Sequence, residues 1–280
     1  MRIIPADHIA QLTARLILDA EFNIGPDIRA ALEAALERET TEPARLALAQ
    51  ILENQQIASS ERTPMCQDTG MIVVFAELGQ DVHIDGGFEE AIQSGAREAF
   101  REGYLRASVV DDPLFDRINT RDNSPAVVHT RVVPGDQLRL LVMPKGFGSE
   151  NMSGVRMFAP SAGRAGVADF IVDTVVRAGS NPCPPTIIGV GIGGTMEQCC
   201  LIAKRATARR VGSSHPAPRY AALEAECLGR INESGVGPAG FGGLTTALAV
   251  HIEHAPTHIA GMPVAVNIVC HASRHAEGVL

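Results

Sequence analysis

Three amphipathic helices are predicted to open the chain. Over residues 5–22 the apolar side chains recur with the spacing of a helix that buries one face. This stripe consists of Ile9, Leu12, Leu16 and Ile17. Pro26 begins a second helix that runs to about residue 38, because proline is favoured in the first turn, and Pro43 begins a third. The pattern therefore predicts a helical N-terminal region over about residues 1–60.

Beyond this region, short apolar runs alternate with further helical patterns. Residues 71–76 form an unbroken apolar run that is typical of a buried strand. Residues 126–133 and 137–143 flank Pro134-Gly135-Asp136, and this punctuation predicts a β-hairpin. We expect further helices at 88–101, 161–178, 195–210 and 219–233, and further strands at 185–191 and 264–269.

A hairpin mixed with packed helices predicts an α+β fold with a mixed or antiparallel sheet, rather than a strict alternation of strand and helix. No internal repeat, low-complexity tract or linker interrupts the 280 residues. We therefore expect one domain over residues 1–280, large enough to bury a substantial core.

Charge and targeting patterns narrow the classes of function. The net charge of −8 disfavours nucleic acid or an anionic membrane as a partner, because either would require a basic face. We find no signal peptide and no run that approaches the ~18 apolar residues of a membrane span. The protein is therefore expected to be cytoplasmic, where disulfides are rare and cysteines more often bind metal or take part in catalysis.

Three of the six cysteines stand where regular structure must break. Cys66 lies in a polar Pro-Met-Cys-Gln-Asp-Thr-Gly segment, prolines enclose Cys183, and Cys270 ends an apolar run. Ordinary buried cysteines act as small hydrophobes within helices and strands, so these settings suggest thiolates presented to a ligand. Three thiolates could hold a four-iron cluster with one iron open to substrate, and three unrelated thiols are the alternative.

The remaining cysteines have a simpler interpretation. Cys199, Cys200 and Cys227 fall within predicted helices, where we expect them to pack in the core. Cys66, Cys183 and Cys270 are far apart in sequence and belong to no CxxC knuckle, so the zinc-ribbon interpretation is rejected.

Two glycine-rich segments could approach an anion. Residues 145–151 read Lys-Gly-Phe-Gly-Ser-Glu-Asn after a predicted strand, where glycines would let backbone N–H groups come close and Lys145 would add charge. A tight turn is the alternative. Residues 189–195 lack the GxGxxG spacing and the acidic ribose-binding residue, so a nucleotide site is not expected.

Two further polar residues are candidates for substrate contacts. Arg106 could bind a carboxylate through two parallel hydrogen bonds, although most such arginines are merely solvated. His251, His254 and His258 do not follow the HExxH order, and Pro256 would disrupt a helix that placed two of them on one face. A zinc site is therefore not expected, but His258 could serve as a polar contact.

Read in order, these segments resemble the class I fumarate hydratases along nearly the whole chain, and in particular the α subunit of the two-subunit form. The resemblance rests on CQDTG at 66–70, Leu105-Arg106, NSPA at 123–126, KGFGSEN at 145–151, NPCPPTIIGVGIGGTME at 181–197 and Cys270-His271-Ala272. Phe147 departs from the KGGGS that many relatives carry. Tartrate dehydratase α subunits share the CQDTG and CPP motifs.

The resemblance implies an oxygen-sensitive [4Fe-4S] hydro-lyase that interconverts (S)-malate and fumarate, a reaction of the tricarboxylic acid cycle. It implies that Cys66, Cys183 and Cys270 bind the cluster. The substrate contacts that it implies are Gln67, Asp68, Arg106, Gly148 and His258. In this family the catalytic base belongs to the β subunit, so none is assigned here. We expect a hetero-oligomer such as an α2β2 assembly.

Three alternatives remain open from the sequence. The same chemistry could act on L-tartrate or on a methyl-substituted diacid. A non-catalytic iron–sulfur protein that senses oxygen or iron would need the cluster but no diacid pocket. A structural protein would need neither.

Overall fold

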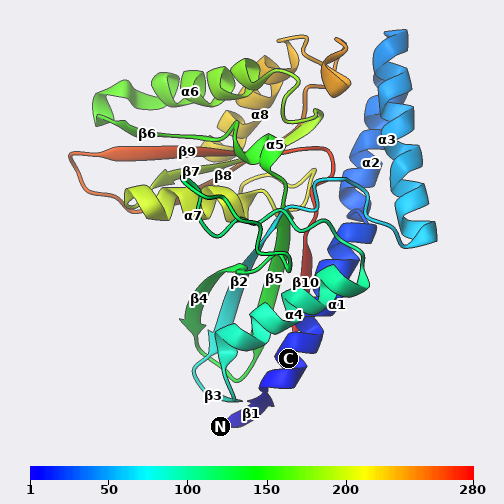
Figure 1. The fold of residues 1–280 in the computed structure, drawn as a ribbon. Coiled ribbons are helices and arrows are strands. Elements are labelled where there is room, and N and C mark those ends of the chain that lie inside the picture. The colour runs from blue at the N-terminus through cyan, green and yellow to red at the C-terminus, as the bar shows by residue number, and fades with distance from the viewer. The chain divides into compact units, whose positions relative to one another are not determined.

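The computed structural model describes residues 1–280, which fold into two compact units (Figure 1). Unit 1 comprises Met1–Ile24, Gln55–Phe147 and Arg274–Leu280, and unit 2 comprises Gly25–Asn54 and Gly148–Ser273. Both units combine helices with mixed sheets, so the α+β prediction is confirmed. The single domain expected over residues 1–280 stays a prediction.

Unit 1 is built on a four-stranded sheet of order β10-β5-β2-β4. The strands are β2 (Met71–Gly79), β4 (Val127–Val133), β5 (Leu138–Lys145) and β10 (Ala276–Val279). Helix α1 (Ala6–Phe22) packs on α4 (Phe88–Glu102) and on β5 and β10 (Figure 1). Its predicted apolar stripe supplies one side of the core, and buried residues of β2 and β5 supply the other. Strands β1 (Arg2–Pro5) and β3 (Val82–Asp85) form a small parallel pair.

The predicted hairpin between residues 126–133 and 137–143 is wrong. Both strands exist as β4 and β5, but β2 lies between them and pairs parallel with β4 and antiparallel with β5. The end of β2 enters the turn, where the N–H of Gly79 bonds the carbonyl of Gln137 and that of Gln80 bonds the carbonyl of Val133. A strand as apolar as β2 gains from pairing along both edges, and this long-range pairing prevails over the local turn pattern.

Unit 2 contains a second four-stranded sheet, of order β6-β9-β7-β8. Its strands are β6 (Gly154–Phe158), β7 (Thr186–Gly193), β8 (Ala247–Ala255) and β9 (Met262–Val269). Helices α6 (Gly163–Ala178) and α8 (Pro218–Asn232) pack on one face, and α7 (Met196–Ala206) covers the other (Figure 1). Strands β1, β3, β6, β8 and β10 were not predicted, and α7 ends four residues before its predicted end.

The glycines that superficially suggested a nucleotide site have a packing role instead. A β-carbon on Gly189 would lie 2.1 Å from the carbonyl oxygen of Ala203, and one on Gly191 would lie 2.0 Å from that of Cys199. Only glycine therefore permits α7 to lie this close to β7. Cys199 and Cys227 are fully buried, which confirms their predicted place in the core.

The three N-terminal helices are confirmed as α1, α2 (Pro26–Arg38) and α3 (Glu42–Glu61), the last of which passes from unit 2 into unit 1. Short helices α5 (Phe147–Glu150), η1 (Pro160–Ala162) and η2 (Pro238–Gly240) complete the fold. None of the helices combines the length and the apolar character needed to cross a lipid bilayer.

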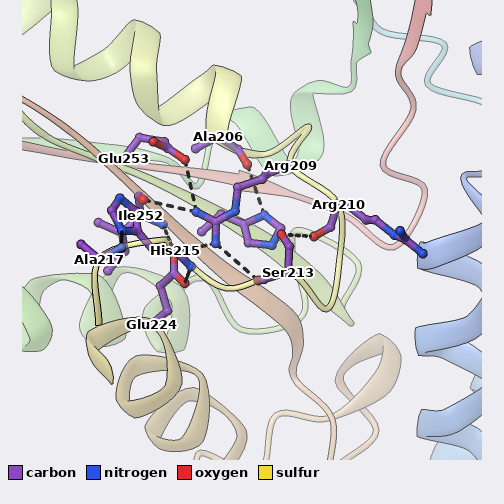
Figure 2. Close-up of polar contacts among 10 residues, drawn as sticks. Ala206, Arg209, Arg210, Ser213, His215, Ala217, Glu224, Ile252 and Glu253 are labelled. Atoms are coloured by element: carbon purple, nitrogen blue, oxygen red, sulfur yellow. Dashed lines mark hydrogen bonds and ion pairs between the residues drawn. The ribbon is translucent and has the colours of Figure 1, made fainter. Parts of the chain in front are cut away.

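Side chains cover the outer edge of β8, which pairs with β7 alone. Glu224 of α8 accepts the backbone N–H of Ile252 at 2.8 Å, and Asn232 bonds both the N–H and the carbonyl of Ala247. Arg209 bridges Glu224 at 2.6 Å and donates to the carbonyl of Ile252 at 3.4 Å (Figure 2). These contacts satisfy backbone groups that would otherwise invite pairing with another chain.

Candidate functional site

In unit 1, the segment around Cys66 forms a loop between α3 and β2. The backbone N–H of Met65 bonds the carbonyl of Glu21 in α1 at 3.1 Å, which fixes the start of the loop. Cys66 is half-buried, and its Sγ lies 3.7 Å from Oε1 of the exposed Gln67. A partly accessible thiol in irregular backbone agrees with a ligand-facing role better than with core packing.

Asp68 organises this loop through both of its carboxylate oxygens. Its Oδ1 accepts the backbone N–H of Gly70 at 3.0 Å, and its Oδ2 accepts that of Phe147 at 2.8 Å. The second bond joins two motifs that are 79 positions apart in sequence. Each carboxylate oxygen can accept a further hydrogen bond, because an ionised carboxylate offers about four acceptor sites.

The segment that carries Arg106 is tied to the same loop. Thr69 donates its hydroxyl to the carbonyl of Arg106 at 2.9 Å. The fully buried Asn123 donates to the carbonyl of Gly70 at 3.0 Å and accepts the N–H groups of Ser108 and Val109 at 2.7 and 3.2 Å. The Arg106 side chain itself is exposed. Unit 1 therefore brings together Cys66, Gln67, Asp68 and the backbone of Arg106.

The end of β5 lies against this loop. Gly70 has a φ of +76°, and a β-carbon there would lie 2.6–2.8 Å from the backbone of Lys145. Lys145 is buried, and its Nζ donates to the carbonyl of Gly146 at 3.0 Å. The glycine of CQDTG is thus required by the close approach of the KGFG segment.

Two charged residues beneath these motifs were missed in the sequence. Glu21 of α1 and Arg274, just before β10, form an ion pair of 2.8 Å with side chains 0% and 1% exposed. Burial raises the pKa of Glu21 to about 7, against the lowering effect of Arg274 and with a further rise from Asp68. The sign of a buried Glu21 in the sequence is its position on α1. It follows the fully buried Ile17 by one helical turn, so it continues the apolar stripe.

In unit 2, the other two outlying cysteines stand at one end of the sheet. Cys183 precedes β7 by three residues and Cys270 directly follows β9, and these strands run antiparallel with Ile187 opposite Val269. The N–H of His271 also points to the carbonyl of Cys183 at 3.4 Å. Cys183 is exposed and has a left-handed φ of 53°, and Cys270 is half-buried.

The second half of the KGFGSEN segment meets this end of unit 2. A β-carbon on Gly148 would lie 3.6 Å from the carbonyl oxygen of Asn181, two residues before Cys183. Glu150 is held by Lys204 of α7 at 2.5 Å and by Asn267 of β9 at 2.9 Å. Gly148, Cys183 and Cys270 therefore belong to one region of unit 2.

His258 lies elsewhere in unit 2. It follows β8, whose last residue, Ala255, pairs with Gly193 at the far end of β7 from Cys183. The eight residues of β7 at about 3.3 Å each place His258 roughly 25 Å from the two cysteines. Its Nδ1 accepts the N–H of Ala260 at 3.1 Å, and its side chain is exposed.

The cysteine environments separate ligand candidates from core residues. Burial raises the pKa of Cys199 to about 12 and that of Cys227 to about 11, which disfavours the thiolate that metals bind. Cys66, Cys183 and Cys270 instead lie in loops with partial or full exposure. Three accessible thiols suit the iron of an iron–sulfur cluster as a donor set. Neither unit by itself gathers three or more His, Cys, Asp or Glu side chains that could hold a metal ion.

Comparison with known proteins adds independent findings. The family model described as "Fumarate hydratase (Fumerase)" matches residues 10–279. "Putative L(+)-tartrate dehydratase subunit alpha" of Methanocaldococcus jannaschii is 37% identical over 273 residues, which cover 96% of each chain. "L(+)-tartrate dehydratase subunit alpha" of Escherichia coli K12 is 30% identical over 272 residues, which cover 96% of this chain and 89% of that one.

These matches extend over nearly every motif described above, and they agree with the resemblance found in the sequence. The Asp68 and Cys183 regions both fall within the matched range. The chain therefore belongs to the class I fumarate hydratase (Fumerase) family, as a hydro-lyase chain of the α-subunit type.

Proposed function

We propose that the protein is the α subunit of a [4Fe-4S] hydro-lyase that interconverts (S)-malate and fumarate, a reaction of the tricarboxylic acid cycle. The observation that carries the proposal is the gathering of Gln67, Asp68 and the Arg106 segment around one loop of unit 1. The side chains of Gln67 and Arg106 remain exposed, as a contact to a bound diacid requires.

The proposed contacts divide the recognition of a diacid among different groups. The Arg106 guanidinium would bind one carboxylate through two parallel hydrogen bonds. The amide of Gln67 would donate to a carboxylate or hydroxyl oxygen, and Asp68 would accept from a hydroxyl. Gly148 would offer its backbone N–H to the substrate, and a β-carbon there would meet nothing closer than 3.6 Å.

Cys66, Cys183 and Cys270 are the residues that would hold the cluster, since their loop positions and exposure suit thiolate ligands. When bound through three thiolates, such a cluster supplies a Lewis-acidic iron for the substrate hydroxyl. The chain's own contribution is to hold the diacid, because hydroxide leaves only when the neighbouring carboxylate is oriented and its developing charge is stabilised.

A partner is needed to complete this chemistry. A dianionic substrate requires paired cations; in the Asp68 region of unit 1 Arg106 is exposed, whereas Lys145 and Arg274 are buried. The relatives are named as α subunits. We therefore propose that a β subunit supplies further cations and the catalytic base within a hetero-oligomer such as α2β2.

Because His258 lies far from Cys183 along β7, it would contact substrate at the site of a second copy.

A second candidate substrate is L(+)-tartrate, which the names of the relatives favour. Tartrate carries one more hydroxyl than malate, and a site that selects it must provide a polar partner for that group. Phe147, whose backbone N–H bonds Asp68, has an apolar and half-exposed side chain that cannot be this partner. The fumarase-like stretches at 105–110 and 145–151 support malate over tartrate.

Steady-state kinetics of the αβ complex, assembled without oxygen, test the proposal. We expect the highest kcat/KM with (S)-malate, lower values with L(+)-tartrate and methyl-substituted diacids, and almost no turnover by the isolated α chain. Negligible turnover of malate together with rapid turnover of tartrate would assign the second candidate. A loaded cluster without turnover of any diacid would instead support an iron–sulfur sensor.

Iron and sulfide content provides an assay of the ligand set. Cys66→Ser, Cys183→Ser and Cys270→Ser should each lose most of the iron, whereas Cys200→Ser on α7 serves as the matched control and should retain it. Air should inactivate the loaded enzyme, and Fe²⁺ with a reductant should restore activity. Full iron content in all three serine variants would reject the ligand assignment.

A further inference from the structure

The Glu21–Arg274 pair in unit 1 is a buried charge system for which the proposed chemistry has no direct use. Glu21 Oε2 lies 2.8 Å from Arg274 Nη1, and both side chains are shielded from solvent. Burying two charges is costly even when they are paired, so such a pair is weak evidence for stability alone. Its surroundings indicate a more specific role.

The carboxyl group of Glu21 is under-satisfied. Its Oε1 is buried and has no hydrogen-bond partner, whereas its backbone carbonyl accepts the N–H of Met65. Nearby Asp68 adds to the electrostatic effect on the Glu21 carboxyl. A buried acceptor without a partner destabilises the fold, and it is expected where another requirement outweighs stability.

Arg274 reaches from Glu21 toward the KGFG segment. A β-carbon on Gly146 would lie 3.1 Å from Asp68 Oδ2 and 3.3 Å from Arg274 Nη2. The carboxylate and the guanidinium therefore flank the same side of Gly146. On the next residue, Phe147, the backbone N–H bonds the same Asp68 oxygen. One arginine thus stands between α1 and the two motifs that meet at Asp68.

We propose that Arg274, anchored by Glu21, is a positioning residue that fixes Asp68 and residues 145–147 in the arrangement that binds the diacid. This inference rests on the proposed function. Arg274 does not itself touch substrate, because it is almost fully buried and acts through Asp68. The planar fork of the guanidinium suits this task, since it can face Glu21 with one nitrogen and Gly146 with another.

Arg274→Lys in the αβ complex tests the role, because an ammonium group cannot span both directions. We expect kcat/KM for the preferred diacid to fall at least tenfold, mainly through a higher KM, with iron content and melting temperature near those of the parent. Arg139→Lys is the matched control: it is a half-exposed arginine of β5 paired with Glu277. Kinetic constants within twofold of the parent in Arg274→Lys would overturn the inference.

A double-mutant cycle separates positioning from a general loss of stability. If Arg274 acts through Asp68, the combined loss in Asp68→Asn with Arg274→Lys should be much smaller than the product of the two single losses. Multiplicative losses would overturn the inference. If Arg274→Lys does not fold, Glu21→Gln decides, because it keeps the side-chain volume but removes the charge that anchors Arg274. An unchanged KM in Glu21→Gln would then overturn the positioning role of the pair.

Hydrogen exchange on the same complex gives a readout that does not depend on turnover. In Arg274→Lys, peptides covering residues 64–70 and 145–150 should exchange faster, while those from β4 should match the parent. If the parent complex turns over neither malate nor tartrate, the proposed function fails, and this measurement still decides the inference. Unchanged exchange in both segments would reject it.

Discussion

Asp68 accepts the backbone N–H of Phe147 at 2.8 Å, and this single bond joins the CQDTG loop to the KGFG segment. The other oxygen of the same carboxylate accepts the N–H of Gly70. An aspartate in a motif of this kind is naturally interpreted as a substrate ligand. Here it also determines the shape of the loop, so a substitution at Asp68 should affect both binding and local structure.

Asp68→Asn should lower the free energy of unfolding by about 2 kcal/mol, because one backbone donor would face an amide N–H2 and lose a bond to a charged acceptor. Since the loop would lose its fixed shape, kcat/KM should also fall at least about tenfold. Urea unfolding and steady-state kinetics measure the two effects. The exposed Asp116→Asn is the control, and equal stability of the two variants would contradict the structural role.

Asn123 should be essential for holding the Arg106 segment against the CQDTG loop. Its side chain bonds three backbone groups from inside the protein, at Gly70, Ser108 and Val109. Asn123→Ala would leave those groups without partners, so unfolding should become easier by about 2–4 kcal/mol. Asn119→Ala, at an exposed asparagine of the same segment, should cost far less. Thermal and urea unfolding would show the contrast, and a loss below about 1 kcal/mol for Asn123→Ala would argue against the role.

Local sequence patterns predicted the helices and the irregular segments around the outlying cysteines, but not the pairing of strands. The three N-terminal helices are visible because each buries one face at helical spacing. Pro134-Gly135-Asp136 is typical of a hairpin, yet β2 lies between β4 and β5. Pairing of this kind depends on contacts far apart in sequence, which local composition does not encode.

The candidate site shows the same limit. Cys66, Cys183 and Cys270 are recognisable because irregular backbone surrounds each of them. Glu21 and Arg274 belong to no motif, and only the fold reveals that they are paired and buried beside Asp68. The one local sign is the position of Glu21, a charged residue that continues the apolar stripe of α1.

Alkylation rates should divide five of the six cysteines into two classes in the chain without cluster. Cys183 is exposed and Cys66 and Cys270 are half-buried, so iodoacetamide should modify them first. Cys199 and Cys227 should react slowest, because burial both blocks access and raises the pKa of each thiol, to about 12 and 11. Peptide mass spectrometry measures the order. Early modification of Cys199 or Cys227 would contradict the assignment of these residues to the core.

Glu21 should make the chain less stable as pH rises. Its pKa of about 7 in the folded protein exceeds the ordinary 4.5, so the folded state binds more protons between these values. The free energy of unfolding should therefore fall from about pH 4.5 to pH 7, by on the order of 1–3 kcal/mol relative to Glu21→Gln. Urea unfolding at several pH values measures this difference. The exposed Glu61→Gln is the control, and a flat difference between parent and Glu21→Gln would refute the effect.

His251 of β8 should produce the opposite trend in unit 2. Burial, with the nearby Arg209, lowers its pKa from 6.5 to about 4 against the influence of Glu224 and Asp27, while Nδ1 faces the carbonyl of Ala206 at 3.2 Å. The unfolded chain therefore binds more protons between these values, and stability should fall as pH drops from about 6.5 to 4.

The effects of Glu21 and His251 oppose each other over much of one pH range, so the curve of the parent protein alone does not separate them. The difference in stability between the parent and His251→Gln should separate them, because the variant lacks the imidazole and should lose less stability on acidification. His254→Gln, on the same strand but exposed, is the matched control. If His251→Gln followed the parent at every pH, the buried imidazole could not be a source of acid sensitivity.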